Sequence, residues 1–222
     1  MQAPEATAIS PAEGTSATPA AARGEGGWGA GSTLRRVLLL APAVFALHNA
    51  EESATMARWA RDQLPGLLAQ ARAAVPPQLL PPGGAELLAR LQPPSPAEFY
   101  WAALLATVIP AILYWTAAAR GPRSRWTPVA VWCQAIFLLN IFVPHLAASL
   151  VLRRYTPGVV TAVLLDLPLS WVLFRAALRE GVLSRRAFGI FLLSAVVGYA
   201  ALLGALLALA RQLAEMSAGA GY

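Results

Sequence analysis

The sequence predicts an all-α integral membrane protein, in which five transmembrane helices form a bundle behind a disordered N-terminal tail. Three observations indicate this class. The chain of 222 residues is 57% hydrophobic, and only 13% of its residues are charged, against about 25% in ordinary soluble domains. Its mean hydropathy is +0.55. Five apolar runs are each close to the ~20 residues that a helix needs to cross the hydrocarbon core of a bilayer.

The positive charge follows the ends of the apolar runs. The net charge of +6 comes from 17 arginines without a lysine, in stretches such as "LRRV", "ARGPRSRW" and "LRRY". Flanks of this kind face lipid headgroups and the cytoplasm, so the lipid bilayer is the expected partner and nucleic acid is not. The single cysteine, Cys133, excludes an intrachain disulfide and a CxxC metal site.

The N-terminal residues 1–33 are rich in Ala, Pro, Gly, Ser and Thr, a composition that predicts a disordered tail. The stretch "LRRVLLLAPAVFA" that follows also resembles a signal peptide, with cleavage near Ala46. Because it begins only after a 33-residue polar tail, which is late for such a signal, a first membrane helix is the preferred interpretation.

Residues 34–211 then form one transmembrane domain. Within it, residues 60–98 are the one long connection, broken by three "PP" pairs. Leu64, Leu67, Leu68, Ala71 and Val75 recur there at helical spacing and predict a short amphipathic helix outside the membrane; a linker without structure is the alternative. The five apolar segments are about 34–59, 99–119, 127–152, 158–179 and 186–211.

Topology follows from the arginines on each side. With the N-terminus inside, ten arginines are cytoplasmic and seven are not, so the positive-inside rule favours a cytoplasmic N-terminus and an external C-terminus. The cytoplasmic ten are Arg23, Arg35, Arg36, Arg120, Arg123, Arg125, Arg175, Arg179, Arg185 and Arg186.

The motif "ALHNAEES", residues 46–53, places an imidazole and two carboxylates inside the first apolar segment. One carboxylate at the centre of a membrane helix costs about 2.5–3.5 kcal/mol on insertion scales. Glu51 and Glu52 must therefore be protonated, paired or bound to a cation. At about 100° per residue, Glu51 points about 60° to one side of His48 and Glu52 about 40° to the other, so the three side chains share one helix face.

The third and fourth segments add further polar groups. Asn140 and His145 would point about 140° apart on a straight helix, but Pro144 between them predicts a kink that brings them together. In the fourth segment, Asp166 and Ser170 share a face. Asp166 is either a further site residue or a structural partner for an arginine.

Two histidines and two glutamates are a ligand set that suits zinc, iron or manganese. The order of the residues, histidine before glutamate, matches neither the Glu-x-x-His motif of di-metal bundles nor HExxH. The alternative is that these groups only hold neighbouring helices together. The predicted metal ligands are His48, Glu51, Glu52 and His145.

These residues resemble a known family. "HNAEE" at 48–52, Asn140 with His145, and "RRYTPGVVTAVLLDLPLS" at 153–170 are similar to conserved blocks of the HXXEE domain family of bacterial integral membrane proteins, over roughly residues 34–210. The function of that family is undetermined. The resemblance implies a multi-pass protein of the bacterial cytoplasmic membrane and a membrane-embedded, metal-dependent enzyme.

Two functions follow from this site. The first is an enzyme acting on a lipid-soluble or small-molecule substrate, with His48, Glu51, Glu52, Asn140 and His145 as its catalytic residues and one glutamate as general base. The second is a small transporter or proton relay that uses the same groups. An enzyme needs a pocket open on one side, whereas a conductor needs polar residues that continue to both sides. An assembly factor, in which the buried charges only specify packing, is a third alternative.

Overall fold

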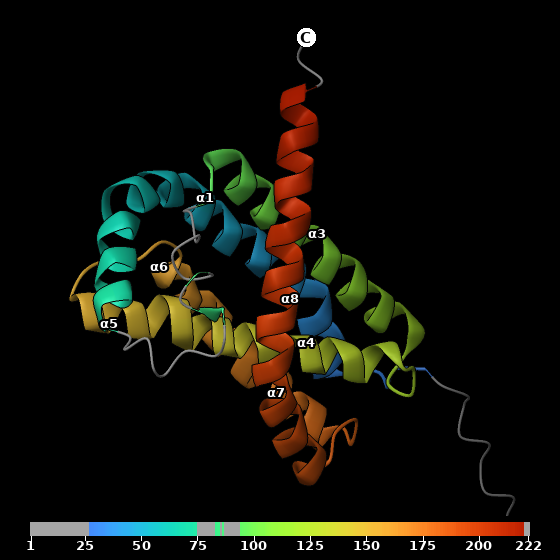
Figure 1. Ribbon diagram of the computed structural model, residues 1–222. Helices are drawn as coiled ribbons and strands as arrows, with labels where there is room; N and C mark the ends of the chain where they lie inside the picture. Colours follow the sequence, from blue (N-terminus) through green and yellow to red (C-terminus); the bar gives the residue numbers. More distant parts are fainter. Residues whose placement is uncertain (1–26, 75–82, 85, 87–93, 220–222) are drawn as a thin grey trace, which may run out of the picture.

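The computed structural model describes residues 27–74, 83–84, 86 and 94–219, and the regular elements in them are helical (Figure 1). Most of the predicted tail, residues 1–26, lies outside these residues, as does Val75 of the predicted amphipathic helix. The elements are α1 (Thr33–Ala74), α3 (Pro96–Arg120), α4 (Trp126–Asn140), η2 (Ile141–Ala147), α5 (Ala148–Leu152), α6 (Val159–Thr161), η3 (Ala162–Asp166), α7 (Leu167–Arg179) and α8 (Arg185–Gly219).

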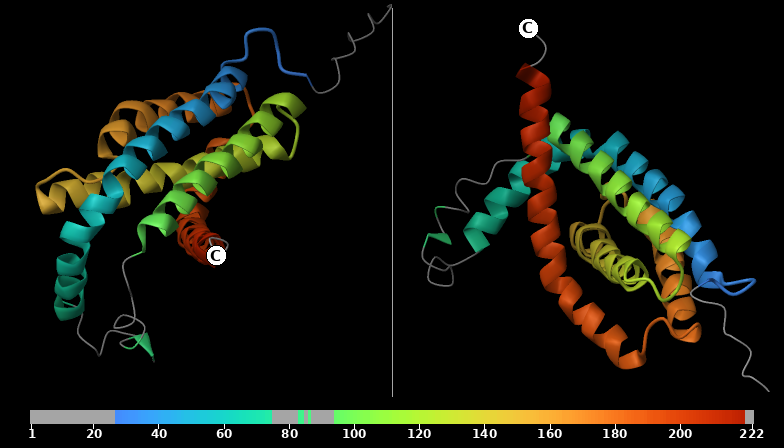
Figure 2. Two further views of the ribbon diagram at one scale, coloured as in Figure 1. Left: turned by 90° about the horizontal axis from the view of Figure 1, so that it is seen from above. Right: turned by 90° about the vertical axis from the view of Figure 1, so that its right-hand side faces the viewer.

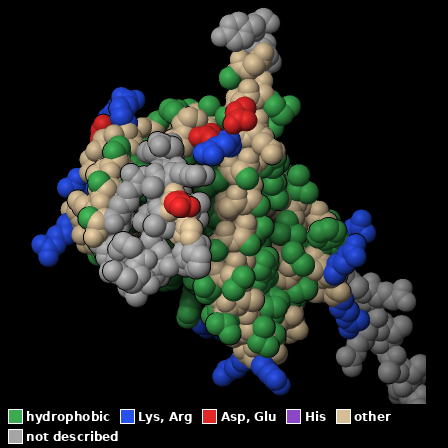
Figure 3. Space-filling model, in the orientation of Figure 1, with side chains coloured by type: hydrophobic (Ala, Val, Ile, Leu, Met, Phe, Trp, Pro, Cys, Tyr) green, Lys and Arg blue, Asp and Glu red, His purple; other side chains and the backbone are tan. Residues whose placement is uncertain are grey.

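Four helical stretches in the described residues are long and apolar enough to cross a membrane: Pro96–Arg120, Trp126–Leu152, Val159–Arg179 and Arg185–Gly219. Their outer surfaces are apolar, as a lipid-facing surface requires. Trp171 is 67% exposed, Leu193 76% and Val197 74%, and hydrophobic side chains cover much of the face shown in Figure 3. The prediction of an all-helical protein of the membrane type is therefore confirmed.

Helix α1 differs from these four stretches. It has 42 residues, but the polar motif and its flanking arginines lower its hydropathy, so a fifth span remains a prediction. Leu40 and Leu47 on this helix are 61% and 57% exposed, which is consistent with a lipid-facing side. The first apolar segment was expected to end near residue 59. Instead α1 continues as one helix through Pro65 to Ala74, and its last part bends away from the bundle (Figure 2).

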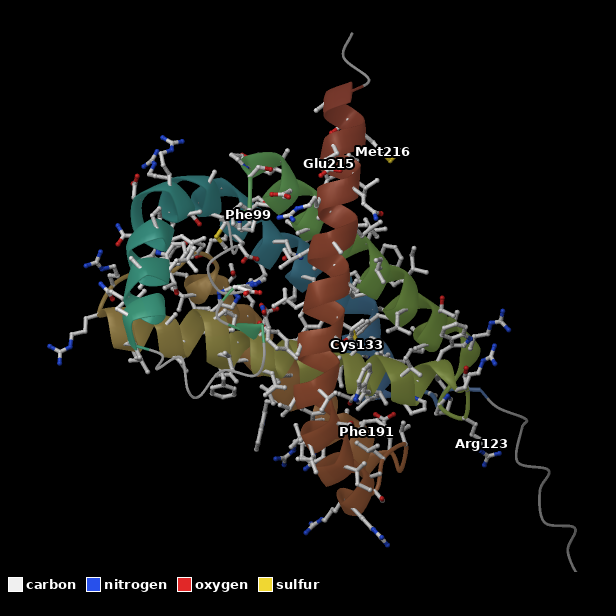
Figure 4. All side chains as sticks on the ribbon, in the orientation of Figure 1. Phe99, Arg123, Cys133, Phe191, Glu215 and Met216 are labelled. Carbon is white, nitrogen blue, oxygen red and sulfur yellow. The ribbon has the colours of Figure 1, made fainter. Side chains whose placement is uncertain are left out.

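The core forms where the helices meet around α4. Helix α4 contacts α3, α7 and α8, while α1 lies against α3 and α7 (Figure 2). Phe45 of α1 is fully buried; its ring stacks on Phe137 at 4.1 Å and meets Tyr114 edge-on at 5.3 Å. Cys133, labelled in Figure 4, lies on α4 with its side chain partly buried. This apolar layer closes the bundle on one side of the buried polar groups.

Specific contacts tie the helix ends together. Trp28 Nε1 donates to the carbonyl of Ala118 at 2.7 Å, which brings the end of α3 to the start of α1. Glu180, just after α7, accepts hydrogen bonds from Ser32 Oγ at 2.7 Å and from the Leu34 amide at 2.9 Å. At the opposite end, Arg211 Nε of α8 pairs with Glu98 Oε1 at 2.7 Å. Helices α1 and α8 therefore run in one direction, and α3 and α7 run in the opposite direction.

Two membrane-type stretches contain a π-helical segment. Segment η2 includes Pro144, which has no N–H and so interrupts the α-helical hydrogen-bond pattern. The sequence predicts a kink at this position, and the interruption takes the form of a π segment. Segment η3 ends at Asp166. Because π segments are rare and occur frequently at functional sites, both mark the region described next.

Candidate functional site

The two histidines of the chain meet in the interior. His48 comes from α1 and His145 from η2. Their ring centroids are 4.8 Å apart with the rings at 84°, and each residue is only 2% exposed. The prediction that these groups meet across neighbouring helices agrees with this geometry.

Glu52 completes a group of three. One donor atom each from His48, Glu52 and His145 lie within 4.8 Å of one another. Glu52 Oε2 is 3.9 Å from His48 Nε2, and its side chain is 26% exposed. The group is therefore buried on the histidine side and reachable on the glutamate side.

Hydrogen bonds orient both imidazoles in the same way. His145 Nδ1 lies 2.7 Å from the carbonyl oxygen of Pro157, which can only accept, so this nitrogen carries a proton. His48 Nδ1 lies 3.0 Å from Asp166 Oδ2 and 3.0 Å from Thr161 Oγ1. With both Nδ1 atoms used as donors, the Nε2 atom of each ring is an acceptor, and that of His145 faces the Asn140 amide. Metal-binding histidines in proteins are typically held in this way.

The π segments place the partners of the histidines. In such segments backbone hydrogen bonds run from residue i to i+5. Asn140 and His145 are five residues apart across η2, and Asn140 Nδ2 lies 3.0 Å from His145 Nε2. Thr161 and Asp166 are five residues apart across η3, and both contact His48 Nδ1. Each π segment therefore brings together two side chains that an α-helix would separate.

Glu51 is not part of the group of three. Its Oε2 accepts hydrogen bonds from the Thr161 amide at 2.8 Å and the Thr161 hydroxyl at 2.6 Å. Its Oε1 accepts from Tyr155 at 2.6 Å and from the Val160 amide at 3.4 Å. Burial and this hydrogen bond raise the pKa of Tyr155, which lies between two helical stretches, so its hydroxyl remains a donor at neutral pH. Glu51 thus fastens the turn formed by residues 155–161 to α1.

Gly158 lies directly against both imidazoles and is a site residue that sequence reasoning missed. Its φ is +77°, and a Cβ built on it would lie 2.9 Å from His48 Cε1 and 3.0 Å from His145 Cε1. A side chain here would push the histidines apart. The sequence places this glycine in the "YTPGVVT" stretch, where a Pro-Gly pair indicates a turn but does not indicate a contact with the histidines.

Asp166 lies at the inner end of the site and is 2% exposed. Its Oδ1 is buried and has no hydrogen-bond partner among the described residues. Its carbonyl accepts from Ser170 Oγ at 2.8 Å, which in turn accepts from Gln134 Nε2 at 2.8 Å. Gln134 Oε1 accepts from Tyr114 at 2.7 Å. This buried chain holds the backbone of Asp166, and so its contact with His48, in place.

Tyr199 supports Asn140 from helix α8. Its hydroxyl donates to Asn140 Oδ1 at 3.2 Å, so the amide nitrogen of Asn140 faces His145. Residues of α1, η2, η3 and α8 therefore all contribute to one buried site.

Comparison with known proteins identifies the chain at the level of family. No curated protein and no solved structure matches it. A family model described as a protein of unknown function with HXXEE motif matches residues 39–173, a stretch that includes His48, Glu52, His145, Gly158 and Asp166. Because that match covers more than half of the sequence, the chain belongs to the HXXEE family.

Proposed function

We propose that the protein is a membrane-embedded metalloenzyme in which His48, Glu52 and His145 hold one divalent ion. The observation that carries this proposal is the group of three donor atoms within 4.8 Å of one another, with both histidines oriented by Nδ1 contacts. Paired histidines that served only to join helices would not need a nitrogen of each ring to lie close to a carboxylate.

The donor set fits such an ion. Two histidines and one glutamate hold catalytic zinc and leave a fourth position open. The same two-histidine, one-carboxylate set also holds iron(II) in non-haem enzymes. Both metals are among those expected from the sequence, and elemental analysis distinguishes them.

A bound divalent ion supplies Lewis-acid chemistry, polarising a substrate oxygen or lowering the pKa of water. Asp166 and the Pro157 carbonyl keep the imidazole Nδ1 atoms protonated, which leaves the Nε2 atoms as ligands. Asn140 donates to His145 Nε2, so its amide must turn away when that nitrogen binds a metal, and it is then free to donate to a substrate oxygen. We assign Glu51 a positioning role rather than that of general base, because both of its oxygens already accept hydrogen bonds.

The surroundings of the site favour an enzyme over a proton or cation relay. A conductor needs polar groups that continue to both sides of the membrane. In the described residues, the polar chain from Asp166 ends at Tyr114, which meets the fully buried ring of Phe45 edge-on within the apolar core. On the opposite side, Glu52 is partly exposed. A polar site that is reachable from one side only is the arrangement that we expect of an enzyme.

The test is elemental analysis of protein purified in detergent, before and after loading with zinc, iron(II) or manganese. We expect one bound ion per wild-type chain and its loss in His48→Ala, His145→Ala and Glu52→Gln, because each substitution removes one of three ligands. Glu215→Gln is the control. It changes an exposed glutamate of α8 that lies outside the group, and it should retain the metal. A wild-type protein that binds no metal after every loading would refute the proposal.

A further inference from the structure

We propose that a pocket beside the site binds the phosphate group of an amphiphilic ligand. The pocket has a volume of about 400 Å³ and lies between α1 and the turn after α5. The lining residues that carry the argument are Thr55, Arg58, Trp59, Asp62, Arg154 and Tyr155. If the metalloenzyme proposal is correct, this pocket holds the headgroup of the substrate, and to that extent the inference rests on the proposed function.

The pocket continues the helix face that carries the site. Glu52, Thr55 and Trp59 are spaced i, i+3 and i+7 on α1, which places them in one row. From Glu52 to Trp59 the helix rises about 10 Å. Tyr155 joins the two regions, since its hydroxyl lies 2.6 Å from Glu51 Oε1 and 3.3 Å from Thr55 Oγ1. A ligand held in the pocket therefore reaches Glu52 with a part of its structure about 10 Å away.

The pocket presents positive charge that the protein does not neutralise. Among the described residues, no carboxylate oxygen lies within 4.0 Å of a guanidinium nitrogen of Arg58 or Arg154. Asp62 also lines the pocket, so these three side chains leave one net positive charge. Arg154 donates one hydrogen bond, to Gln63 Oε1, and both arginines are exposed. Within the part of the chain that the structure describes, no other acceptor binds the N–H groups of these two arginines, which leaves them available to an anion.

The donors of the pocket suit phosphate. Arg58 and Arg154 line the pocket and are exposed, and their two guanidinium groups match an anion with three or more acceptor oxygens, as phosphate has. Trp59 lines the same pocket. The exposed apolar sides of the neighbouring helices suit acyl chains, so the complete ligand is a phosphate-bearing amphiphile.

The test is native mass spectrometry of the metal-free protein in detergent, with phosphatidic acid and phosphatidylcholine of identical acyl chains. We expect the wild type to prefer phosphatidic acid. The double variant Arg58→Gln/Arg154→Gln should bind phosphatidic acid about tenfold more weakly, because it loses charge-assisted hydrogen bonds. Arg61→Gln/Arg153→Gln is the matched control, since it removes the same charge from the same two segments without touching the pocket lining; its affinity should be unchanged.

Competition with inorganic phosphate separates a free phosphate ligand from a lipid headgroup. Displacement of phosphatidic acid by phosphate shows that the phosphate group suffices, and retention shows that the acyl chains contribute; both results support a phosphate site. Equal loss of binding in the two double variants, or no preference over phosphatidylcholine, would overturn the inference. His145→Ala should still bind phosphatidic acid, so a failure of the metal proposal is distinguishable from a failure of this one.

Discussion

At the scale of single residues, the site depends on the absence of a side chain as much as on the side chains present. Gly158 leaves the space in which the rings of His48 and His145 approach each other, and it adopts a backbone conformation that other residues rarely take. Gly158, which has no reactive side chain, thus sets the distance between the two imidazoles.

We predict that Gly158→Ala abolishes metal binding. A non-glycine residue at this φ costs about 1–2 kcal/mol, and the added Cβ would also collide with both imidazoles. Gly181→Ala is the matched control, since Gly181 has a φ of +70° but its Cβ would meet nothing within 4 Å. Both variants should lose stability in thermal unfolding, Gly158→Ala more because of the collision, while only Gly158→Ala loses the ion in elemental analysis. Equal metal content in the two variants would contradict this role of Gly158.

At the scale of elements, two adjacent glutamates on α1 perform different tasks. Glu51 holds the turn of residues 155–161, and Glu52 faces the histidines. Their separation follows from the α-helix, which turns neighbouring side chains about 100° apart. Glu51 therefore points toward the turn, and Glu52 points toward the imidazoles.

We predict that Glu51→Gln loosens this turn while Glu52→Gln does not. In the wild type, the Glu51 carboxylate accepts hydrogen bonds from the amides of Val160 and Thr161 and from the hydroxyls of Tyr155 and Thr161. A glutamine replaces one of the two accepting oxygens with an NH₂ group, so at least one of these donors would then face another donor. Hydrogen–deuterium exchange should show faster exchange at residues 160–161 in Glu51→Gln only. Unchanged exchange in that variant would show that the turn is held by its own packing.

At the scale of the whole molecule, the contacts at the helix ends bear on topology. The start of α1 lies beside the ends of α3 and α7, so the arginines that flank these ends gather on one side of the bundle. Arg123, in the loop after α3, points away from the helices there (Figure 4). Positive side chains on one side favour a cytoplasmic location for that side.

We predict that α1 crosses the membrane and that the termini lie on opposite sides. Five crossings place the N-terminus inside and the C-terminus outside. Alkaline phosphatase fused after residue 222 should be active, and a fluorescent protein fused at residue 1 should fluoresce. A fusion after Gly121, which should be cytoplasmic and inactive as a phosphatase, is the control. A fluorescent protein at residue 1 that does not fluoresce, with an unchanged control, would mean that α1 lies on the membrane rather than across it, because α3 alone would then separate the N-terminus from Gly121.

Much of this arrangement can be predicted from the sequence alone. The apolar runs predict the helices because hydrocarbon requires every backbone group to bond within its own segment. The high cost of ions in lipid predicts that His48, Glu51, Glu52 and His145 meet, and the structure brings His48, Glu52 and His145 together. The pairing of Asn140 with His145 follows from Pro144, which cannot continue a regular helix.

The different roles of Glu51 and Glu52 depend on the tertiary structure and do not follow from the sequence. Both carboxylates lie near the His48 face of α1, and which of them joins the histidines depends on where the 155–161 turn packs. Two further roles also depend on the tertiary structure. Gly158 matters because the rings of His48 and His145, which come from distant segments, meet beside it. Thr161 and Asp166 contact His48 together because of a π segment, which the periodicity of the sequence does not reveal. Local sequence sets the direction in which a side chain leaves its helix, whereas packing between helices decides what that side chain meets.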